Sequence, residues 1–185
     1  MIITVSGPHG TGKSTYAARL ASGLGLRHIS AGQLFRRLAK EKGLSLEQFG
    51  LFAAEDPSVD RMVDEETMQE AEKGDLVVDG QLAGWVLREV ADLRIYLTAP
   101  ENVRLERIAE RDKMDFEEAR KLTIQRERVQ NERYKKHYGL MVEDRSIYHI
   151  VLDTSFLPLA DTEKVLLTLA RAVRERKMAG RTRKA

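Results

Sequence analysis

Short runs of apolar and β-branched residues alternate along the chain with segments whose apolar residues recur every three to four positions. The runs are predicted to be β-strands and the segments between them α-helices. The five predicted strands are Ile2 to Val5, Arg27 to Ser30, Leu76 to Asp79, Leu93 to Leu97 and Tyr148 to Leu152. Because strands that alternate with helices favour βαβ crossovers, the pattern predicts an α/β fold. We expect a three-layer sandwich in which helices cover both faces of a five-stranded parallel sheet.

A glycine-rich segment directly after the first predicted strand has the form G-x-x-x-x-G-K-S. It comprises Gly7, Pro8, His9, Gly10, Thr11, Gly12, Lys13 and Ser14, followed by Thr15. The glycines allow backbone N–H groups to point at an anion, while Lys13 supplies a positive charge and Ser14 a hydroxyl for magnesium. Apolar residues at helical spacing over positions 17 to 24 predict a helix whose N-terminus faces the same anion. The motif indicates a site for a polyphosphate; the alternative is a glycine-rich turn that binds no nucleotide.

Three polar residues close predicted strands at their carboxyl ends: Ser30, Asp79 and Asp153. In an open α/β sheet ligands bind at these ends, so the three residues are expected to border one cleft beside the phosphate-binding loop. Asp79 follows an apolar strand, as the second magnesium-site residue of many phosphate-loop enzymes does, and is predicted to act with Ser14 through metal-bound water. The alternative role for Asp79 is to cap the next turn.

The segment between the second and third predicted strands, about 31–73, is longer than one crossover helix requires. It is predicted to form a small helical subdomain, with a break at Asp56-Pro57. Its apolar positions, among them Val59, Met62 and Val63, are interpreted as core packing.

A second helical insertion, about 111–136, is predicted between the fourth and fifth strands. Two pairs of arginines lie here or just before it, each pair on one helix face: Arg107 with Arg111, and Arg126 with Arg133. One reading is a solvated charged face, paired with Glu106, Glu110, Glu127 and Glu132. Beside a phosphate loop, however, arginines on a mobile helical segment are suited to neutralising a phosphoryl group in transfer. We expect the insertion to act as a lid.

Chain length, cysteine content and charge exclude several classes of protein. The chain has 185 residues and no cysteine, so we predict one domain over about 1–175 without disulfides, thiolate zinc or a cysteine nucleophile. Seven of its 31 basic residues lie in the last fifteen positions, and the remainder of the chain is mildly acidic, with 24 basic against 28 acidic residues. The sequence pI of 8.8 therefore reflects a basic tail, about 176–185, and a nucleic-acid partner is not expected. We expect a monomeric, cytoplasmic protein with no membrane association, because no apolar run is long enough to span a bilayer.

No nucleophile with an adjacent general base is evident, because the four histidines, His9, His28, His137 and His149, have no evident partners in the sequence. A phosphate acceptor would make such a base unnecessary, since its oxygen is already anionic at neutral pH. A guanine-nucleotide switch is not expected, because no N-K-x-D element occurs.

The segment Ser30-Ala31-Gly32-Gln33-Leu34-Phe35-Arg36 resembles the acceptor segment of nucleoside monophosphate kinases. Together with the phosphate loop and four short motifs, it makes residues 1 to about 173 similar to the archaeal type of cytidylate kinase. The motifs are Val78-Asp79-Gly80, Ala83-Gly84-Trp85, Arg133-Tyr134 and Asp153-Thr154-Ser155.

This resemblance implies an ATP-dependent kinase that phosphorylates CMP or dCMP. It implies ATP on Gly7 to Thr15, with magnesium held by Ser14 and Asp79. The acceptor site would comprise Ser30, Gly32, Arg36, Asp79, Gly80 and Gln81, and the catalytic cations would be Lys13, Arg107, Arg111, Arg126 and Arg133.

One position departs from the family pattern: Gln81 stands where an arginine is expected after Gly80. Glutamine donates hydrogen bonds but supplies no charge, and Arg88 could compensate if its helix turned it toward the cleft. Two alternatives remain beside cytidylate kinase. One is a kinase for AMP or UMP, and the other is a phosphate-loop switch or assembly factor whose ATP changes its affinity for a macromolecule.

Overall fold

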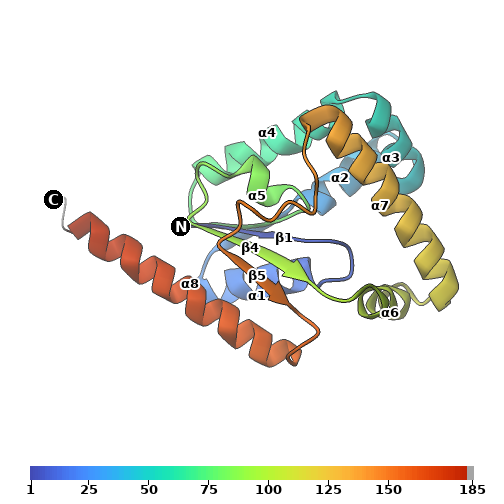
Figure 1. Cartoon of the computed structure of the whole chain (residues 1–185). Helices are drawn as coiled ribbons and strands as arrows, with labels where there is room; N and C mark the ends of the chain where they lie inside the picture. The colour runs from blue at the N-terminus through green and yellow to red at the C-terminus, as the bar shows by residue number, and fades with distance from the viewer. Residues whose placement is uncertain (183–185) are drawn as a thin grey trace.

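A computed structural model of the chain describes residues 1–182, with side chains to 179. Its strands are β1 (Ile2–Ser6), β2 (Arg27–Ser30), β3 (Leu76–Asp79), β4 (Leu93–Thr98) and β5 (Ile150–Asp153). Its helices are α1 (Lys13–Leu24), α2 (Ala31–Glu41), α3 (Leu46–Glu55), α4 (Ser58–Glu72), α5 (Ala83–Val86), α6 (Glu101–Asp112), α7 (Phe116–Tyr138) and α8 (Leu159–Thr182). The ribbon shows helices on both sides of the sheet (Figure 1).

The five strands form one parallel sheet in the order β2-β3-β1-β4-β5. On one face, Leu20 of α1 and Leu166 of α8 pack with Val5 and Ile95 in one apolar cluster. On the other, Ala71 of α4 and the α5 region pack on β3. The predicted three-layer α/β fold is confirmed.

The predicted helical subdomain has its own small core between α2, α3 and α4. Ser45 begins α3 with the reciprocal bonds of a capping box to Gln48, and Pro57 separates α3 from α4. Val59 and Val63 are buried in this core, but Met62 is 52% exposed. The prediction of core packing was therefore wrong for Met62, which lies at the edge of the buried face of α4 and is open to solvent.

The fifth strand begins two residues later than predicted. Tyr148 precedes it and packs its ring edge-on against Tyr96, with centroids 5.0 Å apart. Tyr148 is thus an aromatic contact of the loop, a role that its apolar character did not distinguish from a strand position.

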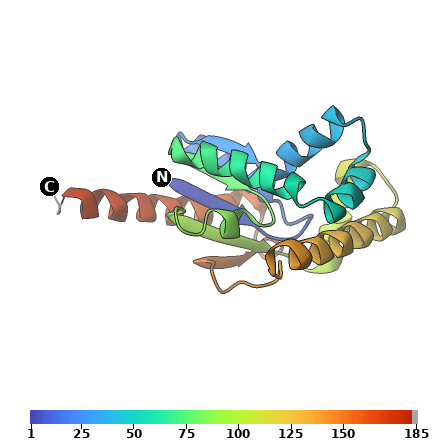
Figure 2. The ribbon, with the colours of Figure 1, turned by 90° about the horizontal axis from the view of Figure 1, so that it is seen from above.

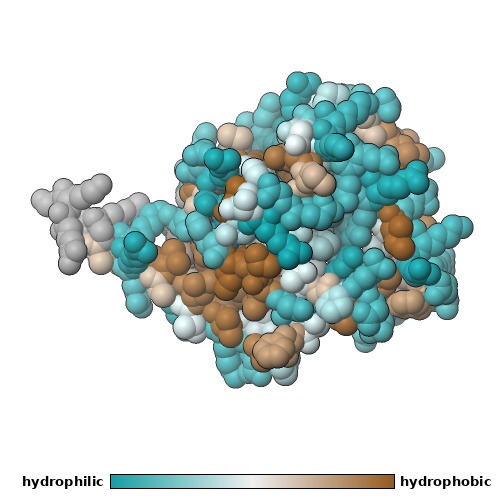
Figure 3. Space-filling model, viewed as in Figure 1, coloured by the Kyte–Doolittle hydropathy of each residue, from teal (hydrophilic) through white to brown (hydrophobic). Residues whose placement is uncertain are grey.

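The helix α8 continues through part of the predicted basic tail, to Thr182, and residues 183–185 of that tail lie outside the described residues. On the face drawn in Figure 3 an apolar area covers part of β5 and α8; Val151 and Val165 are 42% and 41% exposed. Among the described residues, no helix combines the length and the apolar character that crossing a bilayer would require.

Candidate active site

The loop between β1 and α1 is closely packed against the rest of the sheet. Gly7 has φ +138°, and a Cβ atom there would lie 2.1 Å from the carbonyl oxygen of Leu97. At Gly10, with φ +79°, a Cβ would lie 2.4 Å from the Arg104 carbonyl oxygen. Both positions therefore require glycine. Thr11 Oγ1 donates to the Pro8 carbonyl oxygen at 2.9 Å, which further shapes the loop.

Lys13 opens α1, and its half-buried side chain contacts this loop. Its Nζ donates to the Pro8 carbonyl oxygen at 2.8 Å. Burial lowers the pKa of Lys13 to about 8, although the nearby carboxylates of Asp79 and Glu127 act in the opposite direction. A half-buried cation at a helix N-terminus, beside a glycine loop, suits a polyphosphate, which would stabilise the charge.

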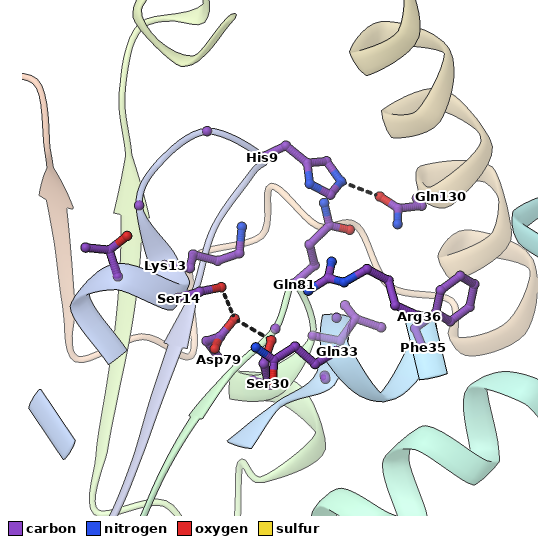
Figure 4. A pocket seen from close by; sticks show the side chains of 18 of the residues that line it. His9, Lys13, Ser14, Ser30, Gln33, Phe35, Arg36, Asp79, Gln81 and Gln130 are labelled. Carbon is purple, nitrogen blue, oxygen red and sulfur yellow. Dashed lines mark hydrogen bonds between the residues drawn. The ribbon is translucent and has the colours of Figure 1, made fainter. Parts of the chain in front are cut away.

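Asp79 is the meeting point of three strands. Parallel pairing places it opposite Val5 of β1 and Ser30 of β2. Its carboxylate accepts hydrogen bonds from Ser14 Oγ at 2.8 Å, Ser30 Oγ at 3.1 Å and His28 Nε2 at 2.8 Å, and Figure 4 shows the two serine contacts. The alternative in which Asp79 only caps a turn is not supported by this geometry.

Ser14 and Asp79 provide adjacent oxygen ligands of the hard type that magnesium prefers. No group of three or more potential ligands from histidine, cysteine, aspartate and glutamate occurs among the described residues. Two protein oxygens are nevertheless what a magnesium ion shared with phosphates and water requires, so the residues fit the ion.

Asp153 does not share this cleft. Its Oδ1 accepts from the backbone N and the Oγ of Ser155, and it is not among the residues that line the cavity. Thr154, the residue directly after β5, lines the cavity instead, and its Oγ1 accepts from Arg107 and donates to the Thr11 carbonyl oxygen. The expectation that all three strand-end residues border one cleft was correct for Ser30 and Asp79 and wrong for Asp153.

The cleft itself has a volume of about 1200 Å³ and runs from the phosphate loop to the α2–α4 subdomain. It is lined by every predicted phosphate-loop residue from His9 to Thr15 except Thr11, which is buried behind it. Gly7 and Pro8 are not lining residues. On the predicted acceptor side it is lined by Ser30, Gly32, Arg36, Asp79, Gly80 and Gln81.

Arg36 and Gln81 both line this cavity (Figure 4). The Oε1 atom of Gln81 is buried and has no hydrogen-bond partner among the described residues. Arg88 does not compensate for the missing arginine, since its side chain is 55% exposed, pairs with Glu89 and lies outside the cavity lining. Arg36 thus borders the cleft as a cation in a way that Arg88 does not.

The four predicted lid arginines all line the cleft, but their contacts differ. Arg107 donates to the Oγ1 and the carbonyl oxygen of Thr154, both at 2.9 Å, and Arg111 pairs with Asp112. Burial, followed by repulsion from Arg36, Arg111 and Arg133, lowers the pKa of Arg126. Mutually repelling guanidinium groups around a cavity indicate that the cavity is built for an anion.

These contacts also bear on the alternative reading, in which the arginines lie on a solvated helix face and pair with nearby glutamates. Glu132 pairs with Arg128, and Glu127 pairs with Arg104; neither forms an ion pair with Arg107, Arg126 or Arg133 in the described part of the chain. Arg104 was not predicted. It is buried and joins the His9 carbonyl oxygen to Glu127 at 2.8 and 2.7 Å, so it supports the phosphate loop from α6.

Arg133 contacts residues of the α2–α4 subdomain. Its Nε is 3.2 Å from Asp60 Oδ2, and its guanidinium carbon is 4.9 Å from the ring centroids of both Phe35 and Tyr134. None of its hydrogen bonds or ion pairs within the described chain reaches the phosphate loop. Asp60, Asp64 and Tyr138, which sequence reasoning did not single out, line the same end of the cavity.

All four histidines have partners, which were not evident from the sequence. His9 Nε2 donates to Gln130 Oε1 at 2.8 Å (Figure 4), and His28 contacts Asp79. His137 contacts Asp60, and His149 contacts Arg94. The partners lie 51 to 121 residues away, which is why no local signal identified them. Burial, with the nearby cations, holds the pKa of His9 well below its usual value, so His9 is neutral at pH 7.

Solved structures with the same fold include two small-molecule kinases. A shikimate kinase from Aquifex aeolicus superposes with a TM-score of 0.55 at 19% identity, covering 93% of this chain and 97% of that one. A gluconokinase from Sinorhizobium meliloti superposes with a TM-score of 0.61 at 18% identity, covering 96% and 95%. At these identities the likeness concerns the fold, which is that of phosphate-loop kinases.

The sequence itself is similar to a narrower group. Residues 2–156 match the cytidylate kinase-like family. The cytidylate kinase of Staphylothermus marinus is 44% identical over 166 residues, which are 90% of this chain and 94% of that protein. The cytidylate kinase of Aeropyrum pernix is 44% identical over 167 residues, 90% of this chain and 97% of that protein. Both the match and these relatives extend over most of the fold described above, and the chain therefore belongs to the cytidylate kinase-like family.

Proposed function

We propose that this protein is a cytidylate kinase that transfers the γ-phosphoryl group of ATP to CMP or dCMP, giving ADP and CDP or dCDP. The observation that carries the proposal is the similarity to cytidylate kinases over about 90% of the chain. The cleft supports it, because a phosphate loop and a separate arginine-bordered pocket open into one cavity.

On the donor side, the backbone N–H groups of the loop from Gly7 to Thr15 and the ammonium of Lys13 would hold the ATP phosphates. Ser14 and Asp79 would hold a magnesium ion, which when bound supplies positive charge to the donor phosphates. Asp79 is kept in place for this by Ser30 and His28, at 3.1 and 2.8 Å.

On the acceptor side, Arg36 would orient the phosphate of the monophosphate, with Gln81, Gly32 and Gly80 beside it. An oxygen of that phosphate attacks the γ-phosphorus, a new P–O bond forms, and the bond to the β–γ bridging oxygen breaks as ADP leaves. The attacking oxygen is already anionic, so no side chain has to remove a proton. Lys13, Arg107, Arg111 and Arg126 would stabilise the charge that spreads over the transferred group.

Water must be excluded while this occurs, since it would otherwise accept the phosphoryl group. Helix α7 carries Arg126 across the cleft and would act as the lid, closing when both nucleotides are bound. The kinase would work in the cytoplasm, where both nucleotides occur, and we expect it to be a monomer.

The test is an assay of ADP and CDP formation with ATP, magnesium and a panel of monophosphates. We expect CMP or dCMP to be used best, with one CDP formed per ATP consumed. A preference for AMP or UMP would identify another monophosphate kinase. ATP consumption stimulated only by RNA or a protein would instead identify a switch, which the uncharged Gln81 in the acceptor site leaves open as the second candidate.

A further inference from the structure

The end of the cleft away from the phosphate loop holds charged and aromatic side chains whose hydrogen bonds and ion pairs, among the described residues, do not reach that loop. They come from α4 and α7, which meet through the ion pair of Asp60 with Arg133: Asp60, Asp64, Arg133, Tyr134 and Tyr138. Phe35, Leu46 and Val63 line the same region. An apolar pocket with a few fixed polar groups is the usual environment for a flat ring.

Arg133 is the least satisfied charged group of this cluster. Its side chain is 1% exposed, and its Nε and Nη1 atoms have no hydrogen-bond partner among the described residues. The ion pair with Asp60 has the distance of a contact but not the alignment of a hydrogen bond. Buried donors without acceptors are rare because they are unfavourable. Their retention on the wall of a cavity indicates an acceptor supplied by a ligand.

Asp64 supplies a hydrogen-bond acceptor in the same part of the cavity as the Arg133 donors. Its Oδ2 accepts from the hydroxyl of Tyr138 at 2.6 Å, while its Oδ1 has no donor among the described residues. Burial raises the pKa of Asp64 to about 6, and the negative charge of Asp60 acts in the same direction, while the Tyr138 hydroxyl and Arg133 oppose it. A half-buried carboxylate with a free oxygen is suited to accept a hydrogen bond from a ligand.

The acceptor nucleotide brings such a pattern in its base. Cytosine carries an exocyclic amine that donates, beside a ring nitrogen and a carbonyl oxygen that accept. We propose that Asp64 and Arg133 read the base of the acceptor, the Asp64 carboxylate accepting from the cytosine amine and the Arg133 guanidinium donating to N3 and O2. Uracil has a carbonyl oxygen, O4, in place of the amine. This oxygen cannot donate a hydrogen bond to the Asp64 carboxylate and would be repelled by it. The inference rests on the proposed function and extends it to base selection.

The first experiment changes the substrate and leaves the protein intact. The monophosphate of 2-pyrimidinone riboside lacks only the amine of CMP. With the wild-type enzyme and saturating MgATP, we expect kcat/KM for this analogue to be about 10 to 100 times lower than for CMP. Equal kcat/KM values for the two would overturn the proposal.

The second experiment changes the carboxylate. Asp64→Asn should lower kcat/KM for CMP by a similar factor and should leave UMP equal or improved, because the amide can donate to O4. The variant should have nearly equal kcat/KM values for CMP and the 2-pyrimidinone analogue, because the carboxylate that would accept from the amine is gone. This is the logic of a double-mutant cycle, with one change in the protein and one in the substrate. Glu65→Gln is the matched control: it removes a charge from the neighbouring, exposed position of α4 and should retain the wild-type CMP to UMP ratio. An unchanged ratio in Asp64→Asn would overturn the proposal.

The third experiment separates base reading by Arg133 from the catalytic role that the resemblance implies. Arg133→Lys retains the charge but loses the planar guanidinium. We expect a higher KM for both CMP and UMP, which share O2, with kcat little changed. A fall in kcat at unchanged KM would instead assign Arg133 to phosphoryl transfer and overturn its role here. Should this variant not fold, the analogue measurement with the intact protein still decides for Asp64.

The failure of this inference is distinguishable from failure of the proposed function. If the wild-type protein phosphorylates no pyrimidine monophosphate, the proposed function is wrong. If it phosphorylates CMP but is indifferent to loss of the amine, only the base-reading inference is wrong.

Discussion

At the scale of single residues, the cleft contains charges that the fold holds at an energetic cost. Lys13 is half-buried and has a pKa lowered to about 8, Arg126 is surrounded by other guanidinium groups, and Asp64 has a raised pKa. Such perturbed groups cluster at functional sites because a bound ligand, and not the apo protein, satisfies them.

Replacement of Lys13 by alanine should lower kcat by at least about 100-fold, because one cation that faces the transferred group is removed. The fold should be retained, since the one hydrogen bond of the Lys13 side chain within the described chain is to Pro8. Lys40→Ala, on the exposed face of α2, is the matched control and should keep wild-type turnover. CDP formation and thermal unfolding of both variants check this, and near-normal turnover in Lys13→Ala would remove the proposed mechanism.

Asp64→Asn should stabilise the protein at neutral pH. The native pKa of about 6 lies above the usual value of 3.8, so the free energy of unfolding falls as pH rises from about 4 through 6, and above that the ionised carboxylate is a constant penalty. After allowance for its partial exposure, we expect the variant to be more stable by about 1–2 kcal/mol at pH 7.5.

Urea unfolding of the wild type, Asp64→Asn and Glu65→Gln at pH 4 and pH 7.5 measures this. The difference between wild type and Asp64→Asn should be much smaller at pH 4, where the native carboxyl of the wild type is largely protonated and the unfolded carboxyl is about half protonated. A difference independent of pH would show that the carboxylate charge is not its cause. An Asp64→Asn protein that is more stable but distinguishes CMP less well from UMP would be consistent with a role of Asp64 in binding, since binding residues often reduce stability.

At the scale of elements, the phosphate loop depends on its close approach to β4 and α6. The loop passes so near Leu97 and Arg104 that no Cβ atom fits at Gly7 or Gly10. The buried pair of Arg104 and Glu127 then connects the same loop to α7. The loop conformation is therefore held by residues about 90 to 120 positions away, and not by its glycines alone.

Gly7→Ala should consequently destabilise the protein by more than about 2 kcal/mol, since it combines a backbone clash with a φ that side chains rarely adopt. Gly50→Ala is the control, because Gly50 lies within α3 with nothing within 4 Å of an added Cβ. It should be neutral or stabilising by up to about 1 kcal/mol. Chemical denaturation compares the two, and equal stabilities would contradict the packing described for the loop.

At the scale of the whole molecule, α7 connects the two halves of the cleft. Gln130 of α7 contacts the phosphate loop through His9, and Arg133 and His137 contact Asp60 of α4. Lys136 donates to the Ala54 carbonyl oxygen at the end of α3. Figures 1 and 2 show the helix lying alongside the α2–α4 subdomain. Nucleotides bound at either end would therefore act on the same helix.

Hydrogen exchange should detect this coupling. Amides of α7 should exchange more slowly when ATP and CMP analogues bind, because their anionic groups relieve the repulsion among Arg36, Arg111 and Arg126. We expect a larger effect with both ligands than with either alone, and little change in α8, which packs on α1 and of which only Leu159, its first residue, lines the cleft. Mass spectrometry resolves the segments; exchange in α7 that is indifferent to both ligands would argue against its role as a lid.

The sequence by itself determined the features that depend on local chemistry. The glycines, Lys13 and Ser14 define a phosphate loop wherever they follow a strand, and hydrophobic periodicity located the strands and the two helical insertions. It also placed Ser30 and Asp79 together, because the carboxyl ends of parallel strands meet at one edge of the sheet.

Only the tertiary structure decided how distant side chains meet. The order β2-β3-β1-β4-β5 brings His28 onto Asp79, 51 residues away. The rotation of α7 against α4 sets Arg133 beside Asp60 and Asp64 and leaves Arg126 among the other cleft arginines. A pattern of arginines specifies a helix face, but the partner of that face depends on how two helices far apart in the chain pack, and no local signal carries that information.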